Sequence, residues 1–199
     1  MWMQRACLHT PPYTCAMSNI PASDNGTFLW MTYQAMSKAG LDCAAIFASV
    51  GMPDEPPDRS QRRINSPQQR FWDAAEMVSG DPDIGLRIGG MLPAWRGQVL
   101  EYLFLSSPTF GEGLERALRY SRLMTDAMQF QLRVEGERAI LSGLSHPVRH
   151  YLECATCIVL RFLRHVSEGD FQPQHIQFAH AEGASGPLYE SVYRCPGVL

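Results

Sequence analysis

The period of the hydrophobic pattern changes twice between residues 109 and 167. A Thr109-x-x-Glu112 capping box opens a helical stretch. Apolar and small residues then recur at helical spacing and predict one buried stripe, formed by Phe110, Leu114, Ala117, Leu118, Ser121 and Met124. The period falls to two over residues 128–134, where apolar and polar side chains alternate. This alternation is typical of a half-buried strand.

The second change of period comes at Pro147. Before it, Glu135-Gly136-Glu137 predicts a turn, and residues 138–144 return as the second strand of a hairpin. From Pro147 to about residue 167 the apolar positions recur at helical spacing again. We therefore predict the longest helix there, packed on the apolar face of the hairpin.

The first half of the chain predicts a series of short helices. Residues 1–26 lack periodicity, and we predict a disordered leader, with Met17 as an alternative start. Helical patterns follow at about residues 27–39, 42–50, 66–79 and 81–91. Ser66-Pro67-Gln68-Gln69 is a second capping-box signature, whereas Gly80 suits a helix C-terminus and Asp81-Pro82 the next N-cap and first helical position. Residues 99–105 fit a strand or a helix equally.

The remaining elements complete the predicted fold. Ile176 and Phe178 alternate with polar residues as in a last strand, and residues 189–193 predict a helical turn. With a length typical of a single domain, residues 27–199 are expected to form an α+β domain. It would consist of a small antiparallel sheet with packed helices, preceded by a helical N-terminal subdomain.

Composition and charge narrow the function. The net charge of −3 argues against direct nucleic-acid binding, because that binding needs a clustered basic face. The only arginine cluster, at Arg59, Arg62 and Arg63, is more typical of a solvated linker. No segment approaches about 20 apolar residues, so no membrane span is predicted. The six cysteines show no compact disulfide spacing, and we expect a cytoplasmic protein with reduced thiols.

No catalytic, cofactor or metal site is predicted. His146, His150, Cys154 and Cys157 fall on one predicted helix and span about 16 Å at 1.5 Å per residue. Zinc ligands must instead converge within about 2.0–2.3 Å of the ion. Ser106 and Ser107 precede a proline at a helix start, which is turn chemistry rather than a nucleophile. We therefore predict that the chain is not an enzyme.

Two groups of residues remain as candidates for binding a small molecule. Arginine can pair a carboxylate or a phosphate bidentately, which makes Arg87, Arg96, Arg149 and Arg161 the polar candidates. Pockets also need apolar walls, and the aromatic candidates for these are Trp95, Tyr102, Phe104, Tyr120 and Phe130.

The ordered motifs resemble the N-terminal, arabinose-binding-like domain of AraC-type transcription regulators. The resemblance covers about residues 28–198 and rests on Gly40-Leu41 after the first helix, on Gly80-Asp81-Pro82-x-x-Gly85-Leu86-Arg87, on Gly97 before the 100–114 block, and on the closing Tyr189-x-x-x-Tyr193-x-Cys195-Pro196. It implies an effector-sensing domain that binds a small organic molecule and forms a homodimer. DNA contact would come only through a C-terminal pair of helix-turn-helix units.

The end of the chain departs from that pattern. Pro196-Gly197-Val198 replaces the usual Pro-Val-x-Phe continuation, and we expect a truncated end from which the helix-turn-helix domain is missing. The alternative reading is a stand-alone small-molecule binding protein or an enzyme of the same fold.

Overall fold

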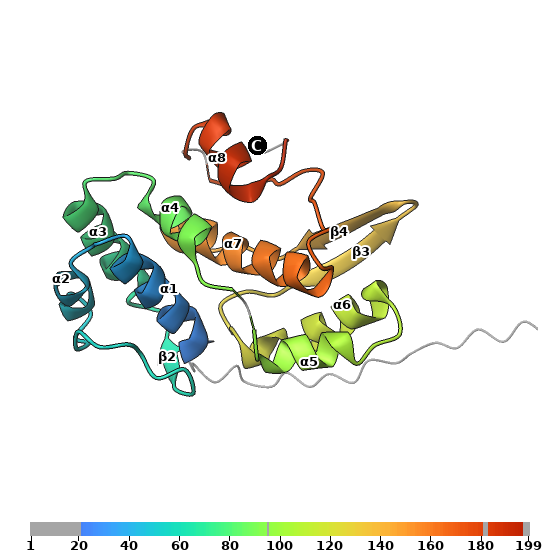
Figure 1. Ribbon diagram of the computed structural model, residues 1–199, viewed down its shortest axis with the longest axis horizontal. Helices are drawn as coiled ribbons and strands as arrows, with labels where there is room; N and C mark the ends of the chain where they lie inside the picture. The colour runs from blue at the N-terminus through green and yellow to red at the C-terminus, as the bar shows by residue number, and fades with distance from the viewer. Residues whose placement is uncertain (1–20, 95, 181–182, 197–199) are drawn as a thin grey trace, which may run out of the picture.

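The computed structural model describes residues 21–94, 96–180 and 183–196. Over these residues the chain forms eight α-helices, one 3₁₀ helix and two antiparallel two-stranded sheets, which confirms the α+β prediction (Figure 1). The helices are α1 (Gly26–Lys38), α2 (Cys43–Ala48), α3 (Gln68–Ser79), α4 (Ile84–Met91), α5 (Val99–Leu105), α6 (Phe110–Arg119), α7 (Arg149–Val166) and α8 (Gly186–Tyr193), with η1 at Ser121–Leu123. The strands are β1 (Ser23–Asn25), β2 (Arg62–Ile64), β3 (Gln131–Glu135) and β4 (Arg138–Ser142).

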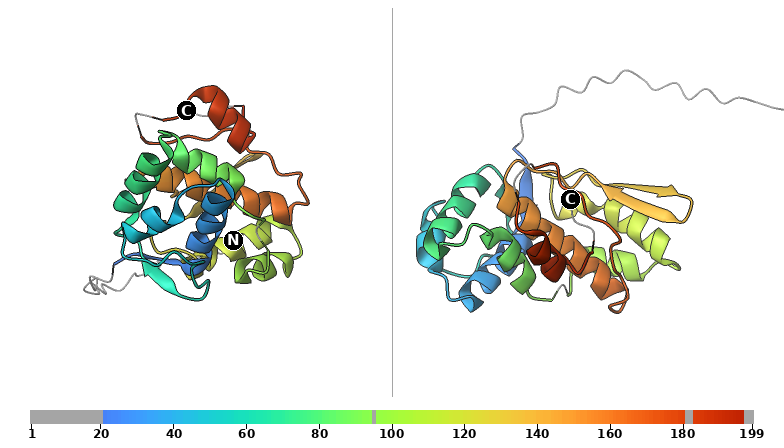
Figure 2. Two further views of the ribbon diagram at one scale, coloured as in Figure 1. Left: turned by 60° about the vertical axis from the view of Figure 1, so that its left-hand side comes forward. Right: turned by 90° about the horizontal axis from the view of Figure 1, so that it is seen from above.

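Helix α7 runs through the middle of the molecule and packs against α3, α4, α5 and α8 (Figures 1 and 2). It is the longest helix, as the sequence predicted. Its middle is buried on nearly all sides, including the positions of Glu153 and Cys154. The core therefore forms around α7.

Helix α4 approaches α7 closely because of two glycines one turn apart. A Cβ atom at Gly85 would lie 2.4 Å from Cα of His150, and one at Gly89 would lie 2.5 Å from Sγ of Cys157. Neither distance is possible for a real side chain, so the close contact requires glycine. The close packing therefore accounts for Gly85 and Gly89. Gly80 has a different role, because it ends α3 in the left-handed conformation, with φ of 65°.

The hairpin prediction is confirmed. β3 pairs with β4 antiparallel, with Leu132 opposite Leu141. The predicted alternation between buried and exposed positions fades along the hairpin, since Met128 is buried, Leu132 is half-buried and Val134 is 68% exposed. The strands extend away from the helices, so only the base of the hairpin has anything to pack against (Figure 1).

The first sheet was not predicted. β1 pairs with β2, with Ser23 opposite Ile64, and buried Asp24 accepts hydrogen bonds from Asn65, Thr125 and Tyr151. The predicted boundary of the disordered leader at residue 26 is therefore too late, because these bonds hold residues 23–25 against the domain. Residues 1–20 of the expected leader lie outside the described residues.

Two predicted helix starts differ in the structure. At α3, Pro67 occupies the N-cap position and no side chain caps the helix. The backbone carbonyl of Asn65 accepts from the amide of Gln68 instead, at 3.0 Å, so the predicted capping box does not form. Helix α4 begins at Ile84, because the Asp81 carboxylate accepts from the amide of Asp83 in a turn that precedes the helix.

The remaining predictions concern the start of α6, residues 99–105 and the C-terminal elements. The Thr109 hydroxyl accepts from the amide of Glu112 and caps α6, which is the N-cap half of the predicted capping box. Residues 99–105 are helical, and residues 189–193 belong to α8. The predicted strand at residues 176–178 is wrong, because Ile176 makes only an isolated bridge. Phe178 instead packs its ring against His180 and the two tyrosines of α8.

Candidate ligand-binding site

An apolar cavity of about 100 Å³ lies between α6, the base of the hairpin and α7. The walls include most of the predicted α6 stripe, namely Leu114, Ala117, Leu118, Ser121 and Met124. Phe130 and Leu141 contribute from the hairpin, and α7 contributes Tyr151, Ala155, Val159 and Phe162. The predicted packing of α7 on the apolar face of the hairpin is therefore not realised, because α7 packs mainly on α4 and faces the hairpin base across this cavity.

The cavity presents almost no hydrogen-bonding groups to its contents. The hydroxyls of its two largest polar lining residues, Tyr151 and Thr125, donate to Asp24 at 3.0 and 2.7 Å. Asp24 lies on β1, so these hydroxyls are already occupied. What remains is a hydrocarbon and aromatic surface, which favours an apolar molecule or the apolar part of one.

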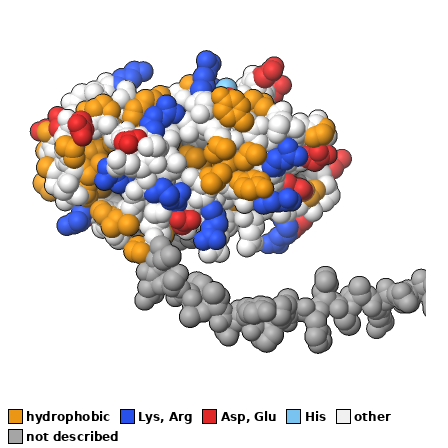
Figure 3. All heavy atoms as spheres, turned by 90° about the horizontal axis from the view of Figure 1, so that it is seen from below, with side chains coloured by type: hydrophobic (Ala, Val, Ile, Leu, Met, Phe, Trp, Pro, Cys, Tyr) orange, Lys and Arg blue, Asp and Glu red, His pale blue; other side chains and the backbone are white. Residues whose placement is uncertain are grey.

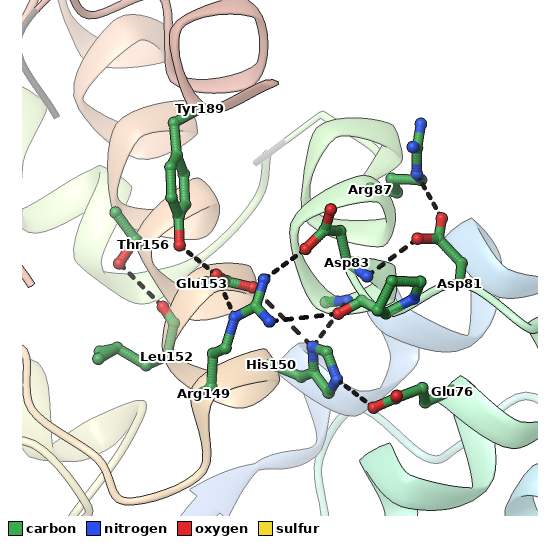
Figure 4. A network of polar contacts seen from close by, with 12 residues as sticks. Glu76, Asp81, Asp83, Arg87, Arg149, His150, Leu152, Glu153, Thr156 and Tyr189 are labelled. Atoms are coloured by element: carbon green, nitrogen blue, oxygen red, sulfur yellow. Dashed lines mark hydrogen bonds and ion pairs between the residues drawn. The ribbon is translucent and has the colours of Figure 1, made fainter. Parts of the chain in front are cut away.

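A buried polar network lies on the other side of α7, where α3, α4 and α8 meet it (Figure 4). Glu153 is fully buried, and its Oε1 accepts from Nε of Arg149 at 2.9 Å and from the hydroxyl of Tyr189. The same Arg149 forms an ion pair with Asp83, immediately before α4. The network thus joins the start of α4 and one face of α8 to the middle of α7.

His150 extends this network to α3. Its Nε2 lies 3.0 Å from Oε2 of Glu76, and its Nδ1 lies 3.9 Å from Oε2 of Glu153, an oxygen without a hydrogen-bond partner in the part of the chain that is described. Burial alone would lower the pKa of His150, but its interactions with Glu153 and Glu76 outweigh burial and raise it. Burial would likewise raise the pKa of Glu153, whereas His150, Tyr189 and Arg149 lower it. Both groups are thereby favoured in their charged forms.

A wider cleft of about 680 Å³ lies between α4, α7 and α8. Its lining includes the predicted residues Arg87, Arg96 and Arg161, together with Arg164 and Arg194. Apolar side chains, among them Leu160 and Leu188, also line it.

The nine candidate binding residues are therefore distributed over several places. Phe130 lines the apolar cavity, Arg87, Arg96 and Arg161 line the cleft, and Arg149 belongs to the buried network. Tyr102 and Tyr120 are 66% and 46% exposed and line neither of these cavities. Of the other aromatic candidates, Phe104 is buried in the core and Trp95 lies outside the described residues.

The sequence reasoning missed Glu153, Asp83 and Tyr189. A pattern of apolar positions assigns a charged residue to the surface by default, and Glu153 is fully buried. One signal was available, since Arg149 and Glu153 stand four residues apart and form an ion pair on one helix face.

The histidines and cysteines of α7 and the segment before it have other partners. His146 Nε2 lies 2.6 Å from Oδ1 of Asn65, and His150 faces Glu76. Cys154 and Cys157 are buried in the core, and burial raises the pKa of each thiol. Among the described residues, no group of three or more potential ligands is placed to hold a metal ion. No helix in that part of the chain is both long and apolar enough to cross a bilayer.

The α+β scaffold holds an apolar cavity and an arginine-lined cleft, and small molecules bind in concave sites of these kinds. Residues 40–198 match the family described as the N-terminal arabinose-binding domain of AraC transcription regulators. Because this match covers most of the chain, the chain belongs to that family, as its motifs indicated. It is therefore a ligand-binding regulatory domain of a family that is not enzymatic. No curated protein matches the sequence.

Proposed function

We propose that residues 27–199 are the effector-sensing and dimerisation domain of an AraC-type regulator and control DNA binding by a C-terminal helix-turn-helix domain. The observation that carries this proposal is an apolar cavity inside a domain of this family. The net charge of −3 supports leaving DNA contact to another domain.

The cavity indicates the class of effector. Its volume of about 100 Å³ is somewhat smaller than that of an apolar cavity of about 150 Å³ that can hold benzene. Its walls are almost wholly apolar, with the hydroxyl of Ser121 as the remaining polar group, so it suits a small ring or a short aliphatic chain. A larger effector would have to displace the hairpin base, where Phe130 and Leu141 are only half-buried.

The position of the cavity suggests how occupancy is sensed. A ligand shifts a conformational equilibrium only when it binds one state more tightly than the other. Several separate elements bound this cavity, so a ligand that fills it favours the arrangement in which α6, the hairpin base and α7 close on it. The effector would thus select one relative position of these elements.

The test compares DNA binding by the chain alone with that of the chain fused to an intact helix-turn-helix domain. In a mobility-shift assay, the chain alone should not bind promoter DNA specifically, and the fusion should respond to an apolar effector. Ala155→Trp fills the cavity from α7 and should abolish the response. Ala139→Trp, at an exposed position of β4, is the matched control and should leave it intact. Specific DNA binding by the chain alone, or equal behaviour of both variants, would count against the proposal.

The surface of α5 supports self-association. Val99, Tyr102 and Leu105 are exposed on α5 at helical spacing. Exposed Phe110 begins the adjacent α6, whose surface carries both Glu115 and Arg119. An apolar stripe beside charges of both signs suits a two-fold contact, in which the same patch meets itself. Figure 3 views the side on which α5 lies, and hydrophobic side chains gather there among basic side chains.

This second part of the proposal has its own test. Sedimentation of the wild-type chain should show a dimer, and Tyr102→Glu with Leu105→Glu should give a monomer. Val134→Glu adds a charge at an equally exposed apolar position on the hairpin and should leave the dimer intact. A wild-type monomer at high concentration would refute the use of α5 as the dimer contact.

A further inference from the structure

The cleft between α4, α7 and α8 has an unusual charge composition. Five arginines and one histidine line it, and no aspartate or glutamate is among the described lining residues. The cationic residues are Arg87 on α4, Arg96 after it, Arg161, Arg164 and His165 on α7, and Arg194 at the end of α8. In a chain whose net charge is −3, this concentration of positive charge calls for a physical explanation.

Contacts within the domain explain only part of it. Arg87 pairs with Asp81, and His165 pairs with Glu101, whose other oxygen accepts from the amide of Gly97. Arg161 donates to the carbonyl of Gly90 at 2.6 Å, and Arg164 donates to the carbonyl of Tyr193. These two carbonyls lie at the C-terminal ends of α4 and α8.

The charge of the cleft remains largely uncompensated. Arg96, Arg161, Arg164 and Arg194 form no ion pair with any residue that the structure describes. A helix C-terminus is equivalent to about half a negative charge, so the two helix ends leave the cleft with about three positive charges. Burial lowers the pKa of both Arg161 and Arg164, and the charge of Arg194 lowers both further.

We propose that the cleft binds a small molecule with two or more oxyanion groups, either carboxylates or phosphates. Each arginine has five N–H donors in a planar fork, so a single carbonyl contact leaves donors for bidentate pairing with an oxyanion. Leu160, Leu188 and Val192 supply apolar surface against which a carbon skeleton can lie. The volume of about 680 Å³ falls in the range of small-molecule sites, about 300–1,000 Å³.

This anion site is separate from the apolar cavity and does not depend on its occupant. The two share α7 but no lining residue among those described. A concave site with an apolar floor favours a small molecule over the extended backbone of a nucleic acid, which needs a continuous basic face.

The test is titration calorimetry of the chain with citrate and with pyrophosphate at constant ionic strength, with acetate as a monovalent reference. The variant Arg96→Gln with Arg194→Asn removes two charges and no ion pair or helix contact. Arg194 has a left-handed backbone, with φ of 51° and ψ of 47°, that asparagine tolerates well. Arg133→Gln with Arg138→Gln removes the same charge from the exposed hairpin and is the control.

We expect saturable binding of citrate or pyrophosphate with a stoichiometry of one, and which of them binds more tightly distinguishes a carboxylate from a phosphate site. The cleft variant should bind at least about tenfold more weakly, because each charge-assisted contact contributes about that factor. The hairpin variant should change affinity less than twofold. Ala155→Trp should leave anion binding intact, which separates this inference from the proposed effector cavity.

Three results would overturn the inference. One is the absence of saturable binding of either polyanion to a wild-type chain whose unfolding transition shows that it is folded. Another is equal weakening in the cleft and hairpin variants, which would indicate unspecific attraction. The third is tighter binding of duplex DNA than of both small anions through these same arginines. That result would assign the cleft to the phosphates of a nucleic acid.

Discussion

The close contact between α4 and α7 predicts how one added methyl group changes stability. In Gly89→Ala the new Cβ would lie 2.5 Å from Sγ and 3.0 Å from Cβ of Cys157, and 3.2 Å from Cα of Cys154. Both cysteines are buried, so neither helix surface can give way into solvent. The shortest of these contacts is to a single side-chain atom, and a second substitution can remove that atom.

Two opposing contributions set the magnitude. Alanine is more favourable than glycine inside a helix by about 0.5–1 kcal/mol. Overpacking a filled core costs about 1–3 kcal/mol, so Gly89→Ala should lower the free energy of unfolding by about 1–2 kcal/mol. Cys157→Ala alone should cost about 1 kcal/mol through the small cavity that it leaves. In the double variant the sulfur is absent, so the two losses should not add, and the coupling should be about 1 kcal/mol or more.

Urea unfolding followed by circular dichroism measures all three variants. Gly111→Ala is the control, because a Cβ at this position of α6 meets no atom within 4 Å, and it should raise stability by about 0.5–1 kcal/mol. The reasoning fails if Gly89→Ala is as stable as the wild-type chain. It also fails if the effects of Gly89→Ala and Cys157→Ala simply add.

Three further predictions concern the polar network, the thiols and the hairpin. Glu153→Gln removes the buried one of the two acidic partners of Arg149, which keeps its ion pair with Asp83, and should cost about 1–3 kcal/mol in the same unfolding assay. The lowered pKa of Glu153 stabilises the wild-type fold above pH 4.5, the ordinary pKa, and this contribution is lost as pH falls through the pKa of Glu153 in the folded chain. The raised pKa of His150 stabilises the fold below pH 6.5, the ordinary pKa, and this contribution is lost as pH rises through the pKa of His150 in the folded chain. Unfolding measured from pH 3 to 9 should therefore show the joint contribution at its maximum between 4.5 and 6.5, and a monotonic profile that Glu153→Gln leaves unchanged would contradict the assignment. Burial raises the pKa of Cys157 to about 12. Mass spectrometry should therefore find the Cys157 thiol unmodified by iodoacetamide at pH 8 until the chain is unfolded. Rapid modification of the folded chain would show instead that this thiol is accessible. Val134→Thr, on the exposed hairpin, should change the free energy of unfolding by less than about 0.5 kcal/mol, and a larger loss would mean that Val134 is covered in solution.

Strong local periodicity made most of the fold predictable. The period-two segment before Glu135 and the helical stripe after Pro147 are hairpin β3–β4 and helix α7 in the structure. The β1–β2 pair could not be found in this way, because each strand has three residues and the partners are distant in sequence. No alternation can be recognised over three positions. The strand expected at residues 176–178 shows that alternation alone is not sufficient, since Phe178 packs on the tyrosines of α8 and Ile176 makes only an isolated bridge, without a ladder.

The candidate site was predictable only as residue types. Arginine chemistry selected Arg87, Arg96 and Arg161, and the fold brings these three to one cleft. Sequence spacing could not show this, because they come from different elements whose positions depend on tertiary packing. The burial of Glu153 depends in the same way on how α4 and α8 cover α7. Roles for these residues in ligand binding stay predictions.

Helix α7 has a mechanical consequence for any regulation by this domain. It has eighteen residues without a glycine or a proline, so it is a stiff rod of about 27 Å. Tyr151, Ala155 and Phe162 line the apolar cavity, and Arg161 and Arg164 of the same rod line the arginine cleft. A tilt of about 5° at the first turn would carry the last turn through about 2 Å, which is a large displacement for a hydrogen bond. Coupling between sites is reciprocal, so a rod that tilted when the cavity was filled would change anion affinity, and the anion would change effector affinity by the same factor. The unchanged anion binding expected of Ala155→Trp therefore requires that α7 keep its orientation when the cavity is filled.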